Sequence, residues 1–165
     1  ALVARSAIDL GAAYAEGNQL RRAHTVYLQG LERVPEDVPL LTALGALEGR
    51  MGSDSAAIAH LREALRIGGK SAVLHNNLGA LYLRQGEQNE ALGHFLELVA
   101  LRPSDAQLRY TVGVLLARSG RSVQAMEHLE HAARLAPQDQ RVAHTLTMLR
   151  DRSIRPATTE HPALP

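Results

Sequence analysis

Residues 72–105 read AVLHNNLGALYLRQGEQNEALGHFLELVALRPSD. In the first half, Leu74 and Leu78 begin a series of apolar residues at the spacing of one face of an α-helix. After Gly86 a second apolar pattern with the same period begins, and it runs to Pro103, which cannot continue a helix. The stretch therefore predicts a hairpin of two amphipathic helices.

The same hairpin pattern recurs along the chain every 34 residues. A glycine inside each expected first helix marks the period, at Gly11, Gly45, Gly79 and Gly113. The turn residues keep the same phase, at Asn18, Gly52, Gly86 and Gly120. Residues whose side chains cap helix N-termini well recur in the same phase, at Asp37, Ser71, Asp105 and Asp139. Several features in one phase indicate a tandem repeat of helical hairpins.

The third copy carries a recognisable signature, with Leu78-Gly79, Tyr82, Ala91, Phe95 and Pro103 in the pattern L-G-x2-Y…A-x3-F…P. This resembles the tetratricopeptide repeat (TPR) family, which has that pattern and a period of 34 residues. The resemblance covers residue 4 to about residue 152, and it implies an all-α fold. Four helix-turn-helix repeats are expected to stack into a right-handed solenoid that ends in a C-terminal capping helix.

The period sets the expected domain organisation. A TPR domain over residues 1–152 is followed by a Pro-rich tail or linker over residues 153–165. The expected repeats and the expected capping helix have these bounds: 4–37, 38–71, 72–105 and 106–139 for the repeats, and 140–152 for the cap. The chain departs from the family pattern in a few places, with Glu48 and Leu116 where a Tyr is usual and Gly69 where a Pro is usual.

Composition limits the classes of partner. Lys and Arg number 18 against 17 Asp and Glu, so no long-range field favours nucleic acid or an anionic membrane surface. The chain has no Cys, which excludes disulfides and thiol chemistry and fits either the cytoplasm or the periplasm. No apolar run approaches membrane-spanning length, and no targeting segment is present, so the compartment stays open.

Catalytic motifs are absent from the sequence. It contains no phosphate-binding loop of the G-x-x-x-x-G-K type, no H-E-x-x-H and no G-x-S-x-G. The glycines are accounted for by the repeat. We therefore predict a non-enzymatic protein without a cofactor, a catalytic site or a metal site.

The resemblance implies that the first helices of the repeats line a concave face, and helical periodicity then selects the side chains that point into it. Ala46 and Ala80 keep the floor of this groove open, while Asn76 and Asn77 offer amides to a peptide backbone. A helical ligand would favour a broad apolar groove, and both modes stay open. The predicted peptide-binding residues are Asp9, Thr42, Asn76, Asn77, Ala80, Arg84, Tyr110, Thr111, Val114 and His144.

One known mode of the family is not expected here. Some members clamp the C-terminal carboxylates of heat-shock chaperones with Lys and Arg from the first helices. In the possible frames, the places where these cations should stand hold uncharged side chains, namely Ile8, Ala12, Thr42, Gln107 and Thr111. We therefore predict no binding of chaperone tails.

Two series of charged or titratable residues follow the repeat. Arg50, Arg84 and Arg118 stand near the ends of first helices, where a cation meets the negative end of the helix dipole, and we prefer this interpretation to a track for an acidic ligand. His60, His94 and His128 lie on second helices, too far apart to share one metal ion.

Two single residues of the first helices stand out as well. His75 is expected to be a packing residue. For Glu48 three roles stay open: reaching solvent, pairing with an Arg, or contacting a ligand.

The sequence thus predicts a protein–protein interaction module that binds a partner peptide in the concave groove, in a bacterial assembly or secretion complex. One alternative is the substrate-recognition TPR region of a larger enzyme such as a glycosyltransferase. Another is a homo-oligomeric scaffold that assembles through the tail or the end helices.

Overall fold

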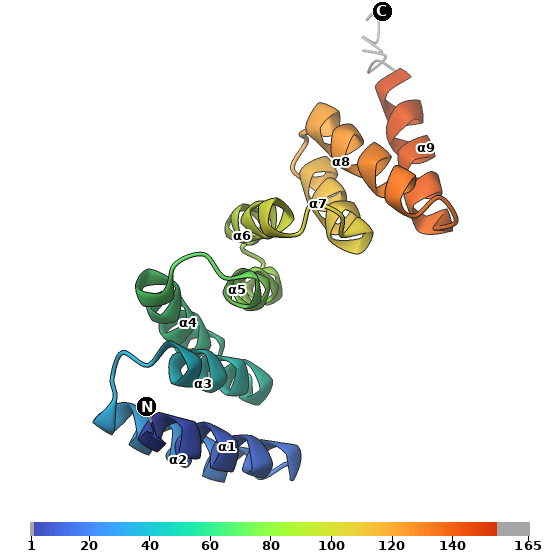
Figure 1. Ribbon diagram of the computed structural model, residues 1–165. Coiled ribbons are helices and arrows are strands. Elements are labelled where there is room, and N and C mark those ends of the chain that lie inside the picture. The colour runs from blue at the N-terminus through green and yellow to red at the C-terminus, as the bar shows by residue number, and fades with distance from the viewer. Residues whose placement is uncertain (1, 155–165) are drawn as a thin grey trace, which may run out of the picture. The chain divides into compact units, whose positions relative to one another are not determined.

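The computed structural model describes residues 2–154, with side chains placed through residue 151. These residues form nine α-helices and no strand, so the prediction of an all-α fold is confirmed for them (Figure 1). The helices are α1 (Leu2–Glu16), α2 (Leu20–Arg33), α3 (Val38–Met51), α4 (Asp54–Gly68), α5 (Ala72–Gln85), α6 (Gln88–Leu101), α7 (Ala106–Arg118), α8 (Ser122–Leu135) and α9 (Gln140–Ile154). Helix α9 continues two residues past the predicted end of the capping helix at residue 152, and the rest of the predicted tail, residues 155–165, lies outside the described residues.

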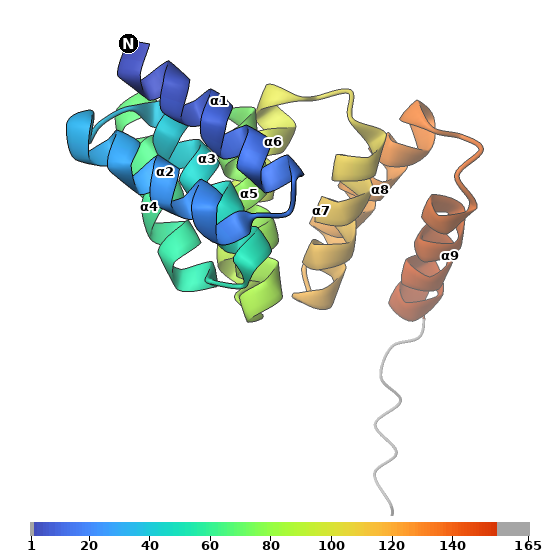
Figure 2. The same cartoon turned by 90° about the horizontal axis from the view of Figure 1, so that it is seen from below.

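The helices pack as consecutive hairpins, α1 with α2, α3 with α4, α5 with α6 and α7 with α8 (Figures 1 and 2). The chain divides into two compact units, Ala1–Leu101 with α1 to α6 and Arg102–Pro165 with α7 to α9. In the first unit, the first helices contact one another in order, α1 with α3 and α3 with α5. Six of the ten predicted binding residues lie on this row of helices, and the other four lie in the second unit.

The capping residues and the turns lie where the repeat predicts them. Asp37 accepts a hydrogen bond from the backbone N–H of Leu40 at 2.9 Å, and Asp105 accepts one from Leu108 at 2.9 Å. Such bonds satisfy N–H groups that the first turn of a helix leaves without a partner. All four predicted turn residues have positive φ, namely Asn18, Gly52, Gly86 and Gly120.

Each hairpin is held close by a glycine of the first helix that faces a large side chain of the second. A Cβ atom added at Gly45 would lie 2.6 Å from Cγ of Leu61, which is fully buried. The ring of Phe95 fills the corresponding space above Gly79. The absence of a side chain at these positions lets the two backbones approach, and the leucine-rich core fills the space around them.

In the second unit, α9 closes the core. Val142 and Leu146 are buried in a cluster with Leu129 and Ala132 of α8, whereas Met148 is 59% exposed. One side of α9 is thus packed and the other faces solvent. This is the arrangement expected of a capping helix.

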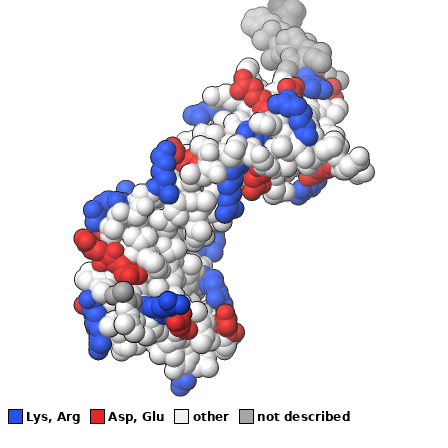
Figure 3. Space-filling view, viewed as in Figure 1, with Lys and Arg blue, Asp and Glu red and all other residues white. Residues whose placement is uncertain are grey.

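The surface is mixed in charge. On the face seen in Figure 3, basic and acidic side chains lie interspersed, in agreement with a net charge of +1. Among the described helices, none combines the length and apolar character needed to cross a membrane.

Candidate functional site

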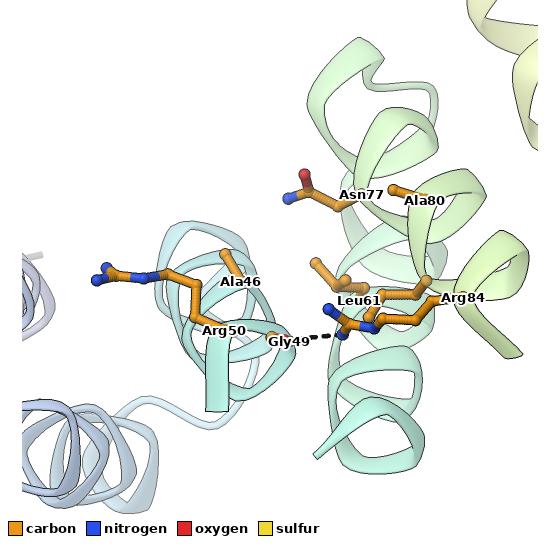
Figure 4. A pocket seen from close by; sticks show the side chains of 9 residues that line it. Ala46, Gly49, Arg50, Leu61, Asn77, Ala80 and Arg84 are labelled. Carbon is orange, nitrogen blue, oxygen red and sulfur yellow. Dashed lines mark hydrogen bonds between the residues drawn. The ribbon is translucent and has the colours of Figure 1, made fainter. Parts of the chain in front are cut away.

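The first unit contains a pocket of about 330 Å³ between α3 and α5, which we call the α3–α5 pocket (Figure 4). Three of the predicted binding residues, Asn77, Ala80 and Arg84, line it from α5. The complete lining is Gly45, Ala46, Gly49, Arg50, Leu61, Asn77, Ala80, Leu81 and Arg84. The structure therefore brings together predicted residues that lie up to seven positions apart, and it adds α3 as the opposite wall.

Most of the residues that α3 contributes to the pocket are small. Gly45, Ala46 and Gly49 have no side chain beyond a Cβ atom, and Arg50 alone of the α3 lining has a long one. Opposite them, Asn77 is half-buried and no hydrogen bond to another described residue uses its amide. A donor and an acceptor are thus available beside an open apolar floor.

The other predicted residues of the first unit, Asp9, Thr42 and Asn76, do not line this pocket. Asn76 and Asp9 are exposed on α5 and α1. The hydroxyl of Thr42 donates to the carbonyl of Val38 at 2.7 Å within its own helix. Thr42 therefore has a local partner that a ligand would have to displace.

In the second unit, Tyr110 takes part in packing. It lies against the core cluster of α8 and α9, and its hydroxyl is 3.5 Å from Oγ1 of Thr145. The guanidinium of Arg141 lies 5.4 Å from the centre of its ring, within the range of a cation–π contact. Since substitution of Tyr110 would also disturb α9, tests of binding are better placed at Asn77.

The other three predicted residues of this unit differ in exposure. Thr111 donates its hydroxyl to the carbonyl of Gln107 at 3.0 Å. Val114 is half-buried on α7, and His144 is exposed on α9. Of this set, His144 offers the most accessible polar group.

The arginines at the ends of α3 and α5 donate hydrogen bonds to the preceding first helix, in addition to lying at the negative end of the dipole of their own helix. Arg84 donates to the carbonyl of Gly49 at 2.8 Å, at the end of the preceding first helix, and forms an ion pair with Asp54 of α4. Arg50 donates in the same way to the carbonyl of Ala15, at 3.3 Å. These arginines therefore bridge consecutive repeats, a contact that the dipole interpretation did not include.

Glu48 is buried between two histidines, so it neither reaches solvent nor pairs with an Arg. Only 4% of the residue is exposed, and its two carboxylate oxygens lie 3.2 Å from Nε2 of His24 and 2.7 Å from Nδ1 of His60. The three residues come from α2, α3 and α4, so the cluster joins the first repeat to the second. The repeat-spaced series of histidines revealed His60, but no signal in the sequence marked His24.

His75 packs inside the third hairpin, as expected. It is 6% exposed, and its Nδ1 lies 3.1 Å from Nδ1 of His94, whose ring stacks on Tyr82. Burial lowers the pKa of His75. Burial also lowers the pKa of His94, helped by the neighbouring His75 and Arg62. Both shifts favour the neutral imidazole, and at least one of the two rings must be neutral to accept the hydrogen bond between them.

Acidification is expected to destabilise this hairpin. Because both folded-state pKa values lie below the ordinary histidine value, the unfolded chain binds more protons, and stability falls as the pH drops from about 7 to about 5. The variant His75→Leu, which copies the buried Leu41 of the preceding repeat, should flatten this dependence. Urea midpoints measured across the pH range test this, and parallel curves for both proteins would contradict it.

No group of three or more His, Asp or Glu side chains is placed to hold a metal ion within the part of the chain that the structure describes. The three histidines of the series have different surroundings. His60 pairs with Glu48 and His94 pairs with His75, whereas Nδ1 of His128 is buried without a hydrogen-bond partner. The histidines thus serve separate local contacts.

Comparisons with known proteins agree with the repeat. Residues 76–140 match the family model described as "Tetratricopeptide repeat". No curated protein matches the chain. Among solved structures, MamA is 22% identical with a TM-score of 0.78, and the alignment covers 92% of this chain and 86% of MamA.

Two further structures share the fold. YrrB, described as a TPR protein with an unusual peptide-binding site, is 20% identical with a TM-score of 0.80, over 90% of this chain and 76% of YrrB. PilF of Pseudomonas aeruginosa is 23% identical with a TM-score of 0.70, over 92% of this chain and 69% of PilF. The resemblance inferred from the sequence is thereby confirmed for residues 76–140, which match the tetratricopeptide repeat model, and the solved structures share the fold of the described helices.

Proposed function

We propose that this protein is a non-catalytic interaction module that binds a peptide segment of a partner protein at the α3–α5 pocket. The observation that carries the proposal is the amide of Asn77, which has no partner among the described residues and stands beside the small residues Ala46 and Ala80. A peptide backbone offers N–H and C=O groups in turn, which an amide satisfies from both sides. The structure of YrrB, with its peptide-binding site, supports the same use of this fold.

A library of random peptides displayed on phage tests the proposal. Peptides enriched on the wild-type protein are synthesised, and their affinity is measured by fluorescence anisotropy. Asn77→Arg should weaken binding about tenfold or more, because a long cation then fills the pocket beside the floor. Circular dichroism should show unchanged helicity, since the side chain of Asn77 is only half-buried and has no hydrogen bond or ion pair to lose.

The matched control is Asn89→Arg, the same substitution at an exposed position of α6. It should leave the affinity unchanged. If no peptide is enriched, or if both variants bind as the wild type does, the pocket is not the binding site.

The complex or larger protein in which this chain acts is also a proposal. The Ala-, Leu- and Arg-rich composition suggests a bacterial source, where similar modules serve in assembly or secretion complexes. Membership of a larger enzyme such as a glycosyltransferase stays a hypothesis. For self-association, the relevant surface is the outer side of α1. There Leu10 is 50% exposed, whereas its equivalents Leu44 and Leu78 are fully buried. This exposed edge supports the hypothesis of a homo-oligomer through an end helix.

A further inference from the structure

Leu10 of α1 stands at a position that the later repeats bury. Leu10 is 50% exposed, whereas the residues one, two and three periods further along the chain are fully buried, namely Leu44, Leu78 and Val112. In the second repeat, Leu44 shares a core cluster with Ala4 and Tyr27 of the first hairpin. Among the described helices, α1 contacts α2 and α3, and both leave the side of α1 that carries Leu10 in contact with solvent.

A groove of about 460 Å³ lies beside Leu10, between α1 and α2 at one end of the first unit (Figure 1). Val3, Ser6 and Leu10 line it from α1, and the charged Glu32 and Arg33 line it from α2. Val3 is itself 42% exposed. The large exposed apolar side chains of this groove therefore belong to α1.

The side chains along this side of α1 alternate in size. Val3 and Leu10 are large, and Ser6 and Ala13, each three residues further along, are small and exposed. These four residues, which we call the α1 edge, recur at the spacing of one helix face. A second α1 that runs antiparallel along the edge with Leu10 opposite Ser6 also has Val3 opposite Ala13. Each large side chain of one copy then faces a small residue of the other, as close packing requires.

Opposite charges flank the α1 edge. Arg5 and Asp9 lie one turn apart, both are exposed, and neither forms an ion pair within the described residues. In an antiparallel pair of helices, each flank of one helix runs along the same flank of the other. Arg5 of each copy therefore lies near Asp9 of the other copy, and the contact occurs twice. The edge is thus complementary to itself in charge as well as in shape.

Helix α9 offers no matching apolar face. The side of α9 that points away from the core carries His144, Thr147 and Arg150, and Met148 is the one large exposed apolar residue among those described there. Arg150 is already paired with Glu130 of α8. A head-to-tail contact would place these polar groups against the α1 edge and remove water from them. The same edge of a second copy is the better partner.

We propose that two copies of this chain associate through the α1 edge, in a two-fold symmetric contact of antiparallel α1 helices. The proposal gives the hypothesis of self-association a surface and a symmetry. This surface is separate from the α3–α5 pocket, so peptide binding and dimer formation can fail independently. Because one helix of each copy supplies the contact, the interface is small, and we expect a dissociation constant on the order of 10 µM.

Sedimentation velocity of the 165-residue chain, from about 1 µM to about 1 mM, covers this range of affinity. The expected result is a monomer at low concentration and a dimer at high concentration, without larger species. Leu10→Lys should weaken association about tenfold or more, because it places a charge inside the apolar contact. Circular dichroism should show unchanged helicity, since Leu10 is half exposed in the single chain.

The matched control is Leu96→Lys, the same change at a leucine of α6 that is 38% exposed. It should leave the dissociation constant of the dimer unchanged. A chain that stays monomeric at every concentration would overturn the proposal. Equal weakening by Leu10→Lys and Leu96→Lys would overturn it too, because association would then not depend on the α1 edge.

Exchanging the two flanking charges tests the symmetry of the contact. Arg5→Asp and Asp9→Arg each place like charges opposite one another twice, so each should weaken association about threefold to tenfold. The double variant restores opposite charges across the contact and should recover most of the lost affinity. A double variant as weak as the single ones, or assembly that continues beyond the dimer, would contradict the symmetric contact.

Discussion

Gly45→Val is expected to destabilise the first unit by about 3 kcal/mol, because the second hairpin has no space for a side chain at this position. A Cβ atom at Gly45 would lie 2.6 Å from Cγ of Leu61 and 3.1 Å from the carbonyl oxygen of Ala57. Leu61 is fully buried and the carbonyl belongs to the backbone of α4, so relief requires the two helices to separate. Thermal or urea unfolding followed by circular dichroism measures the loss.

Gly93→Ala provides the matched control. Gly93 also lies within a helix, α6, but no atom lies within 4 Å of the position that a Cβ would take. Alanine should therefore raise stability by about 0.5–1 kcal/mol through its higher helix propensity. If Gly45→Val unfolds at the wild-type midpoint, the close approach of α3 and α4 does not hold the hairpin.

Glu48→Lys should cost about 3–5 kcal/mol of folding free energy, because it places an unpaired cation where a buried carboxylate joins two histidines. The carboxylate is within 3.2 Å of His24 and 2.7 Å of His60, and no other partner is described for it. Since the three residues come from the first two repeats, the loss should appear as early unfolding of these repeats. Amide hydrogen exchange resolves the helices and measures this.

Glu48→Leu separates the effect of the charge from that of side-chain volume. Leucine already fills the equivalent position of the fourth repeat, where Leu116 is 2% exposed. The side chains of His24 and His60 are about one-third exposed, so water can replace the lost hydrogen bonds. We expect a stability within about 1 kcal/mol of the wild type. A loss as large as that of Glu48→Lys would instead assign the main contribution to the hydrogen bonds of the cluster.

The period of 34 residues predicted most of the local structure. The capping bonds of Asp37 and Asp105 and the positive φ of Asn18 depend on residues close in the sequence, so their positions could be read from it. The same holds for the close approach at Gly45, because the large residue that faces it keeps a constant distance along the chain.

Contacts between repeats were harder to predict. Arg84 pairs with Asp54 across 30 residues, and His24 reaches Glu48 across 24 residues. Neither pair recurs in the other repeats, so no periodic signal marks them. The packing role of Tyr110 was missed for a related reason, since helical periodicity gives the direction of a side chain but not the neighbour that covers it.

The proposed peptide site lies along the first helices of the first unit, at the α3–α5 pocket. Titrating the ¹⁵N-labelled protein with a selected peptide, and following the amide chemical shifts, tests it most directly. The largest shift changes are expected to include Ala46, Asn77 and Ala80. Shift changes confined to the second helices α2, α4 and α6 would contradict it and place the binding site on another surface.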